Sequence, residues 1–390
     1  MSETLSLASD TLMTGCPPTV PYMGHVRRTE SGRWQARYRD PRGRERARNF
    51  KRKIDADRFL IGIESDKLRG QWIDPAAGRI RLSEAAERWY TTTASLKPKT
   101  RNGYRSLLDS RILPYLGDLQ LRQVDPVMVR EWVADLQEDG LSASRIRQAR
   151  NVLHAVFNMA VDGSMVTRNP VAGVKTPPVI STPRRYLTPE QVGTLAHAME
   201  SPYDLLVLVL AYSGIRFGEA AALRRSHCDL EGSRLHISDS LAEVAGQLHF
   251  GTTKTHRQRV VALPSSIRDQ LRDHLDTTCS PSDDLVFKSQ RGRPLRYSNF
   301  RQRVWTPAVQ RAGLAGLEIH ELRHTAASLM IDQGADPKLI QTQLGHSSIS
   351  ITYDIYGHLF PDRLDELAEK LEALIRRSPK GHGLDLGRSI

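Results

Sequence analysis

The chain has 390 residues, which is enough for two or three domains that each bury a core. With 39% hydrophobic and 26% charged residues, and no apolar run near the roughly 18 residues of a membrane span, the composition excludes a membrane-embedded or wholly disordered chain. Its cysteines, Cys16, Cys228 and Cys279, lie too far apart to predict a disulfide framework or a metal knuckle. We therefore expect a soluble protein of the reducing cytoplasm, with no membrane partner.

Positive charge is in excess and is concentrated near the N-terminus. Lys and Arg outnumber Asp and Glu by 56 to 44, and the net charge is +12. Residues 24–72 hold 15 Lys or Arg against 7 Asp or Glu, a local net charge of +8. Such a balance favours a polyanionic partner such as nucleic acid.

The basic segment has the pattern of a small sheet backed by a helix. Residues 1–23 are predicted to be a flexible tail. Residues 33–39 and 44–50 alternate with period two around a turn, which predicts a hairpin, and the apolar spacing from Ala56 to Ile63 predicts a helix behind it. The arginines on the outer face are candidate DNA contacts, although a solvated basic face would have the same pattern. They are Arg33, Arg37, Arg39, Arg44 and Arg46.

A helical region follows, from residue 80 to residue 175. We expect a helix that begins at Leu82 with Ser83 as its cap, and further helices over 99–110, 126–138 and 142–161. The outward side of the last helix carries Arg145 and Arg147, which suit either DNA contact or plain solvation. The pattern predicts a helical bundle.

Three prolines within 176–185 predict an extended linker, after which a mixed domain spans 186–377. Thr188 is the expected cap of its first helix. Its other expected elements are an apolar helix over 203–212, short strands over 234–238, 257–263 and 285–288, and a helix over 362–377 with a leucine stripe that docks on its own domain or on a neighbouring subunit. Residues 378–390 are expected to be a disordered tail. The predicted fold is therefore multidomain α+β.

Five segments of this domain contain groups that can converge on a phosphate. They carry Arg216 three residues before Glu219, Lys254 at the tip of an expected hairpin, His320 and Arg323 on one helix face, His346 after a glycine, and Tyr356 ten residues later. Each has an ordinary alternative when taken alone. An ion pair, a solvated lysine, a structural histidine and a packing tyrosine are common features.

The sequence from His320 to His324 also spells H-E-x-x-H, the pattern of zinc proteases, with His346 as a candidate third ligand. Two observations count against zinc. Arg323 would place a fixed positive charge beside the metal, and a protease has no evident use for the basic N-terminal segment. We therefore expect no metal.

Taken together and in order, these segments resemble the active-site set of the tyrosine recombinase (phage integrase) family. The stretches Leu-Gly-His-Ser-Ser-Ile and Asp-Ile-Tyr-Gly-His-Leu-Phe-Pro resemble its C-terminal signature. By the same resemblance, residues 24–72 are similar to an arm-type DNA-binding domain, 80–175 to a core-binding domain and 186–377 to the catalytic domain. The interval of ten residues between His346 and Tyr356 departs from the nine of many members, which makes Tyr353 the rival nucleophile.

The resemblance implies a site-specific integrase that cleaves and rejoins DNA through a 3′-phosphotyrosine, without metal, cofactor or ATP. Two arginines can clamp a phosphate bidentately, which suits Arg216 and Arg323. A tyrosine hydroxyl with a pKa near 10 needs a base, for which His320 is the best candidate, while Lys254 protonates the leaving oxygen and His346 donates a hydrogen bond.

The implied partners are double-stranded DNA with core-type and arm-type attachment sites and further copies of the chain in a tetramer. DNA-bending and excision factors are additional candidates. The implied location is the bacterial cytoplasm, at the nucleoid during reaction. The alternatives are a type IB-like topoisomerase and a catalytically idle DNA-binding regulator on the same scaffold.

Overall fold

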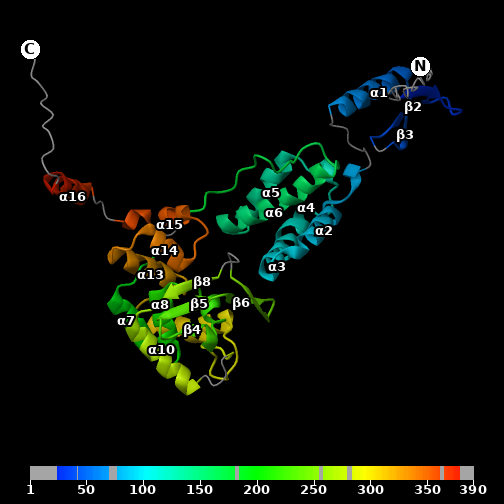
Figure 1. Ribbon diagram of the computed structural model, residues 1–390. Coiled ribbons are helices and arrows are strands. Elements are labelled where there is room, and N and C mark those ends of the chain that lie inside the picture. Colours follow the sequence, from blue (N-terminus) through cyan, green and yellow to red (C-terminus); the bar gives the residue numbers. More distant parts are fainter. Residues whose placement is uncertain are drawn as a thin grey trace, which may run out of the picture. The chain divides into compact units, whose positions relative to one another are not determined.

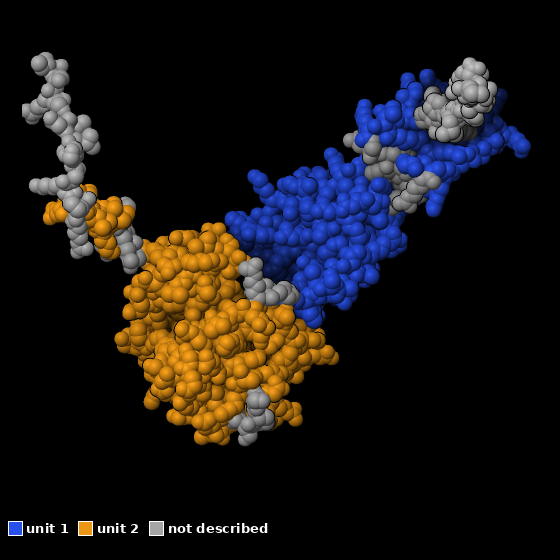
Figure 2. Space-filling model, viewed as in Figure 1, with its two compact units in different colours: residues 1–179 blue, residues 180–390 orange. Residues whose placement is uncertain are grey.

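A computed structural model of the chain describes residues 24–41, 43–69, 77–180, 184–253, 258–278, 283–360 and 364–377. The chain divides into two compact units, residues 1–179 and 180–390 (Figure 2). Helix makes up 56% and strand 13%, so the predicted multidomain fold, mainly helical with small sheets, is confirmed (Figure 1). The two predicted tails, 1–23 and 378–390, lie outside the described residues.

The first unit begins with an antiparallel sheet in the order β1-β2-β3, covered by helix α1. The bounds are β1 (His25–Arg28), β2 (Trp34–Arg39), β3 (Glu45–Phe50) and α1 (Lys53–Leu68). Ala36 and Tyr38 on β2 pack against Ala56, Leu60 and Ile63 on α1. The predicted hairpin and helix are confirmed, whereas β1 was not predicted.

The rest of this unit is a helical bundle, as predicted. Its elements are η1 (Ala77–Arg79), α2 (Leu82–Thr92), η2 (Thr93–Ser95), α3 (Pro98–Leu107), the π-helical turn η3 (Leu108–Ile112), α4 (Leu113–Leu116), η4 (Leu121–Gln123), α5 (Pro126–Glu138) and α6 (Ala143–Asp162). Trp132 of α5 is buried, and its ring nitrogen donates to the carbonyl of Arg111 at 2.8 Å. The apolar faces of α5 and α6 form the core of the bundle together with buried residues of α2, α3 and the η3 turn.

The predicted cap at Ser83 is wrong, because α2 already begins at Leu82. The backbone N–H of Leu82 donates to the carbonyl of Leu119 (2.8 Å), and that of Ser83 donates to the carbonyl of Gly117 (3.0 Å). Neighbouring backbone thus satisfies donors that a capping side chain would otherwise serve.

The second unit is built around a long apolar helix. Its elements are α7 (Pro189–His197), α8 (Tyr203–Ser213), α9 (Phe217–Ala220), η5 (Arg225–His227), β4 (Cys228–Asp229), β5 (Arg234–Ile237), β6 (Asp239–Val244), β7 (Gln247–Thr252), β8 (Arg259–Ala262), α10 (Ser265–Thr278), α11 (Tyr297–Phe300), η6 (Arg301–Trp305), α12 (Thr306–Arg311), α13 (Glu321–Asp332), α14 (Pro337–Leu344), α15 (Ile349–Tyr356), η7 (Gly357–Leu359) and α16 (Leu364–Arg377). Helix α8 packs against α7 and α13, and α14 packs against both α13 and α15 (Figure 1). The predicted cap at Thr188 is confirmed by a complete capping box with Gln191.

Two small sheets lie in this unit, one in the order β4-β5-β8 and the other the hairpin β6-β7. The sequence predicted a hairpin that leads into β8 with Lys254 at its tip. This pairing is wrong, because β7 pairs with β6 and β8 pairs with β5. Ala245 and Gly246, both with positive φ, form the β6-β7 turn, and Lys254 itself lies outside the described residues.

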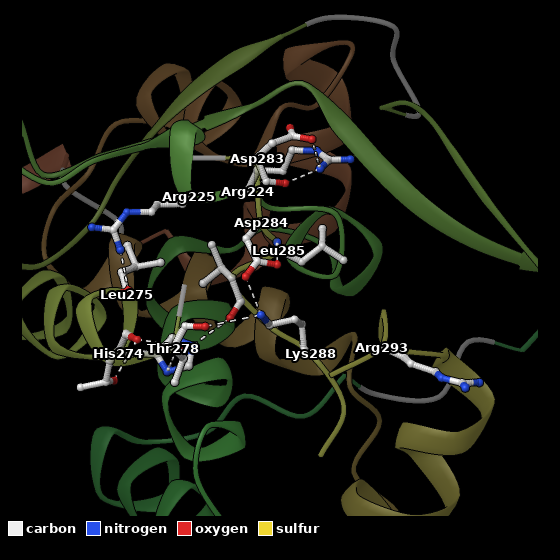
Figure 3. A network of polar contacts seen from close by, with 12 residues as sticks. Arg224, Arg225, His274, Leu275, Thr278, Asp283, Asp284, Leu285, Lys288 and Arg293 are labelled. Carbon is white, nitrogen blue, oxygen red and sulfur yellow. Dashed lines mark hydrogen bonds and ion pairs between the residues drawn. The ribbon is translucent and has the colours of Figure 1, made fainter. Parts of the chain in front are cut away.

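The predicted strand over 285–288 is also wrong. This segment makes only isolated bridges, Leu285 with Arg224 and Lys288 with Pro294. Side chains help to hold it, as Figure 3 shows: Lys288 pairs with Asp284 at 2.6 Å, and Arg224 pairs with Asp283 at 3.0 Å. Backbone bonds join the segment to its neighbour only at single positions, from Val286 N–H to the Leu223 carbonyl and from Arg225 N–H to the Asp284 carbonyl, both at 2.9 Å, so no continuous strand ladder forms here.

Helix α16 is confirmed, and its apolar stripe is partly uncovered. Leu367, Leu371 and Leu374 are 51%, 50% and 62% exposed. Within the described part of the chain, no helix is long and apolar enough to cross a membrane.

Candidate active site

The candidate site lies where four segments of the second unit end or begin. Arg216 lies between α8 and α9, Arg323 lies in the first turn of α13, His346 follows α14, and Tyr356 is the last residue of α15. Helices α8 and α14 both end at a glycine in the left-handed conformation, Gly214 (φ +69°) and Gly345 (φ +71°). A glycine accepts this conformation without strain, so the chain can turn sharply and present the next side chains.

A buried carboxylate fixes the first arginine. Glu219 is 2% exposed; its carboxylate accepts from the Arg216 backbone N–H and guanidinium, both at 2.9 Å. It also pairs with Arg259 on β8 at 2.6 Å. Burial raises the pKa of Glu219, but the bonds and charges of Arg259 and Arg216 outweigh it and hold this pKa below its ordinary value. The carboxylate is thus charged and orients both guanidinium groups.

The second predicted arginine is more deeply buried. Arg323 is 3% exposed, and its Nη1 donates to the carbonyl of Gly214 at 2.6 Å. Its Nη2 is buried and has no hydrogen-bond partner among the described residues. Burial, with Arg216 nearby, lowers the pKa of Arg323. A buried donor without a partner is costly, and an anion that bridged the two arginines would relieve that cost.

The tyrosine is fully buried beside two histidines. Its hydroxyl lies 2.8 Å from Nδ1 of His324, and its ring stacks on the ring of His346 with centroids 6.2 Å apart and planes 12° apart. Burial raises the pKa of Tyr356 to about 12, although Arg323 and Arg184 act in the opposite direction. The hydroxyl is therefore protonated at neutral pH.

Both of these histidines are neutral at pH 7. Burial, followed by nearby cationic groups, lowers the pKa of His324 to about 3 and that of His346 to about 4. His346 Nδ1 lies 2.9 Å from the hydroxyl of Thr352 on α15, which fixes the ring beside the tyrosine. Two neutral imidazoles thus flank the hydroxyl.

The predicted site residues mostly converge. His346 stacks on Tyr356, Arg323 and Arg216 interact electrostatically with Tyr356, and the ring of His320 meets the ring of His324 edge-on, with centroids 5.1 Å apart. The sixth predicted residue, Lys254, lies outside the described residues.

The rival Tyr353, one turn earlier on α15, is exposed where Tyr356 is buried. It is 52% exposed, and its ring contacts Phe360 at 6.0 Å between centroids. The geometry therefore favours Tyr356 as the reactive tyrosine.

Two residues of this site were not predicted as part of it. Arg259 and the buried Val261 are two residues apart on β8, so their side chains point to the same face of the strand. The sequence pattern could therefore have indicated that Arg259 points inward. His324 was weighed only as a metal ligand in the H-E-x-x-H pattern. Among the described residues, no group of three or more His, Cys, Asp or Glu side chains is placed to hold a metal ion.

The predicted DNA-contact arginines differ in their surroundings. Arg33 and Arg44 are exposed, whereas Arg37 pairs with Glu45 at 3.1 Å and Arg46 pairs with Asp40 at 3.3 Å. Arg39 is exposed at the end of β2. In the bundle, Arg145 donates to Gln148 and Ser106 at the wall of a hollow of about 370 Å³, and Arg147 is exposed.

Comparison with protein families gives three matches along the chain. The description "Phage integrase family" matches residues 185–363, "Phage integrase, N-terminal domain" matches residues 22–69, and "Phage integrase, N-terminal SAM-like domain" matches residues 81–137.

Individual relatives agree with these matches. The chain is 30% identical over 363 residues to a protein of Mycobacterium tuberculosis named as the prophage phiRv2 integrase, covering 90% of this chain and 95% of that one. It is 29% identical over 372 residues to the integrase of Mycobacterium phage D29, covering 91% and 98%.

Among solved structures, the Tn1549 transposon integrase in complex with transposon right end DNA has a TM-score of 0.66 at 19% identity, covering 76% of this chain and 100% of that one. A lambda integrase tetramer bound to a Holliday junction has a TM-score of 0.55 at 21% identity, covering 85% and 97%.

Fold and site together define a class of protein, the enzymes that transfer DNA strands by means of a tyrosine. Within that class, the chain belongs to the phage integrase family and is a site-specific tyrosine recombinase.

Proposed function

We propose that this recombinase attacks a DNA phosphodiester with the Tyr356 hydroxyl, stores the DNA as a 3′-phosphotyrosine and reseals it in a partner strand. The observation that carries this proposal is the buried Arg323, which has an unpartnered Nη2 and acts electrostatically on Tyr356. Because the phosphate ester is retained in the tyrosyl bond, rejoining needs no ATP.

The other predicted residues then have distinct tasks. Arg216 and Arg323 clamp the two non-bridging oxygens and neutralise charge in the transition state. His320 is the proposed base that takes the proton of the Tyr356 hydroxyl, and His346 adds a hydrogen bond to the phosphate or to the tyrosine. Lys254 protonates the 5′ oxygen that leaves.

The proposed partner is double-stranded DNA. The core-type site is bound by the helical bundle, through Arg145 and Arg147, together with the catalytic domain. The arm-type site is bound by the basic sheet, through Arg33, Arg37, Arg39, Arg44 and Arg46. The predicted boundaries 24–72, 80–175 and 186–377 are retained as the proposed domains.

The proposed assembly is a homotetramer on two DNA segments. It is supported by the fold shared with the lambda integrase, whose solved structure is a tetramer bound to a Holliday junction. The proposed setting is the cytoplasm of a bacterial host, at the nucleoid during integration or excision of a phage or mobile element.

The test uses a labelled core-site duplex, read from sequenced integration junctions and carrying a nick that traps the intermediate. Wild type and Tyr353→Phe are expected to form covalent protein–DNA bands on denaturing gels, and Tyr356→Phe is expected to form none. If Tyr356→Phe still traps DNA and Tyr353→Phe does not, Tyr353 is the nucleophile.

A further inference from the structure

Arg259 lies on the inward side of β8, and its guanidinium is bound within the protein. The side chain is 9% exposed. Its Nη1 and Nη2 donate to the two carboxylate oxygens of Glu219, at 3.2 Å and 2.6 Å. Its Nε donates to the carbonyl of Gln343 at 3.2 Å. The guanidinium is thus engaged by a carboxylate that also holds Arg216, so its effect on the reaction passes through Glu219.

We propose that Arg259 is a positioning residue of the recombinase: it shares the carboxylate of Glu219, so that the guanidinium of Arg216 stays available to the DNA phosphate. The proposal rests on the proposed function, in which Arg216 and Arg323 clamp the phosphate that Tyr356 attacks. It gives a task to a buried arginine outside the six predicted catalytic residues. Glu219 orients Arg216, and Arg259 limits how strongly Glu219 holds it.

The hydrogen bonds to Glu219 show how the carboxylate is shared. A carboxylate has about four lone-pair positions. Oε1 accepts from Nη1 of Arg216 at 2.9 Å and from Nη1 of Arg259 at 3.2 Å. Oε2 accepts from the backbone N–H of Arg216 at 2.9 Å and from Nη2 of Arg259 at 2.6 Å. Without Arg259, each oxygen would have a vacant position, and a bidentate pair with Arg216 would draw that guanidinium away from the phosphate.

Arg259 also sets the charge that the site offers to DNA. Arg216, Arg259 and Arg323 are cationic and Glu219 is anionic, so the cluster has two positive charges in excess. A phosphodiester is an anion, and charge develops on its non-bridging oxygens in the transition state. Without Arg259, the carboxylate would cancel the charge of Arg216 and leave only that of Arg323. The shared carboxylate therefore keeps the clamp positive enough for the reacting phosphate.

The end of α14 holds Arg259 from its other side. Gly345, the left-handed residue that ends this helix, leaves the space that the arginine fills, because an added Cβ would lie 2.7 Å from Cδ and 2.9 Å from Nε of Arg259. The side chain of Gln343 joins the same strand, since it accepts from the Ala262 N–H at 3.0 Å and donates to the Ala262 carbonyl at 2.9 Å. This packing fixes the direction in which the guanidinium meets Glu219.

The test compares two substrates with the variant Arg259→Gln. One is the nicked core-site duplex, and the other is the same duplex with a methylphosphonate at the scissile position, where a methyl group replaces one non-bridging oxygen and removes its charge. Covalent-complex formation is timed on both at saturating protein. We expect Arg259→Gln to react about 100-fold more slowly than wild type on the phosphodiester. On the methylphosphonate we expect a loss about 10-fold smaller, because a neutral group depends less on the excess positive charge.

A merely structural role for Arg259 would slow the reaction of both substrates by the same factor, and that result would overturn the proposal. Both rates come from one preparation, so a partly unfolded fraction lowers them equally and leaves their ratio unchanged. The matched control is Arg272→Gln, which removes an arginine of α10 that pairs with the exposed Glu231 at 3.0 Å. This variant is expected to keep the wild-type rate on both substrates.

A double-mutant cycle keeps the proposal testable if Arg259→Gln does not fold. Glu219→Gln is compared with Glu219→Gln/Arg259→Gln on the ordinary duplex, and the double variant leaves neither buried charge without its partner. Because Arg259 acts through Glu219, its removal in the Glu219→Gln background is expected to change the rate by less than about 3-fold. A much larger loss would overturn the proposal, since Arg259 would then act without the carboxylate. Covalent product from Tyr356→Phe would refute the proposed function instead, so the two failures are distinguishable.

Discussion

Glu219 shows at the residue scale how the site holds several positive charges together. It is the buried carboxylate between Arg216 and Arg259, and its side chain is 1% exposed. Removing one partner of a buried ion pair leaves the other charge uncompensated, which costs more than the pair itself contributes. Glu219 is therefore a stability determinant as well as a positioning residue.

Glu219→Gln is expected to lower the free energy of unfolding by about 3 kcal/mol, measured by urea denaturation at pH 7. The matched control is Glu87→Gln, which removes an exposed partner of Arg105 and should cost less than about 1 kcal/mol. Equal costs for the two variants would contradict the role given to Glu219.

The same residue predicts a pH dependence. Because the folded-state pKa of Glu219 lies below its ordinary value of 4.5, its contribution to stability is present above pH 4.5 and is lost as pH falls through the folded pKa. Wild type should therefore lose more stability than Glu219→Gln when urea denaturation is repeated at decreasing pH below 4.5. Equal losses of stability in the two proteins would show that other carboxylates cause the destabilisation below pH 4.5.

Some residues of the site could be predicted from the sequence, and others could not. Arg216, Arg323, His346 and Tyr356 could be chosen because their order and spacing are specific. The strand pattern could indicate that Arg259 points inward, but not that its partner is Glu219, because Glu219 is 40 residues away and only the fold brings β8 to the start of α9. The sequence shows His324 as part of the H-E-x-x-H pattern. Its contact with the Tyr356 hydroxyl depends on the direction of Nδ1, which spacing alone does not give.

At the element scale, helices with a clear period or cap were predicted well, and paired strands were not. Helix α5 begins after Asp125, whose side chain accepts from two backbone N–H groups, and its predicted bounds are confirmed. The short strands β4, β6 and β7 were missed because their pairing depends on distant partners rather than on local pattern. The turn at Ala245 and Gly246 decides that β7 pairs with β6.

Gly214 ends α8 at a position where an added side chain should disturb both the fold and the site. Gly214 has φ +69°, and an added Cβ would lie 3.2 Å from Ala326 Cβ and overlap the side chain of Leu344. Gly214→Ala should therefore cost about 1–3 kcal/mol and slow DNA cleavage, because the Gly214 carbonyl holds Arg323. Thermal unfolding and the nicked-substrate assay measure the two effects.

Gly193→Ala is the control for that substitution. Gly193 lies within α7, with no heavy atom within 4 Å of the added Cβ and no positive φ. Alanine has the higher helix propensity, so this variant should be neutral or up to about 1 kcal/mol more stable. If Gly193→Ala destabilised the protein as much as Gly214→Ala, backbone strain would not be the cause.

At the scale of the whole molecule, the net charge of +12 predicts that DNA affinity depends strongly on salt concentration. Each phosphate neutralised by a cationic side chain releases counterions, so the logarithm of the binding constant falls with the logarithm of salt concentration by about 0.9 per contact. Only side chains that are not already committed to carboxylates contribute fully. The basic sheet offers both kinds, since Arg33 and Arg44 are exposed while Arg37 and Arg46 pair with acidic residues.

The double variant Arg33→Ala/Arg44→Ala of the full chain is therefore expected to lower the salt slope by about 1.8, if each arginine meets one phosphate. Arg37→Ala/Arg46→Ala removes the same formal charge but also releases Glu45 and Asp40, so its effect on the slope should be smaller. Fluorescence anisotropy on a short mixed-sequence duplex, at several sodium chloride concentrations, measures both. An unchanged slope for Arg33→Ala/Arg44→Ala would remove the sheet from the DNA interface, because exposed arginines at an interface cannot lose their charge without changing counterion release.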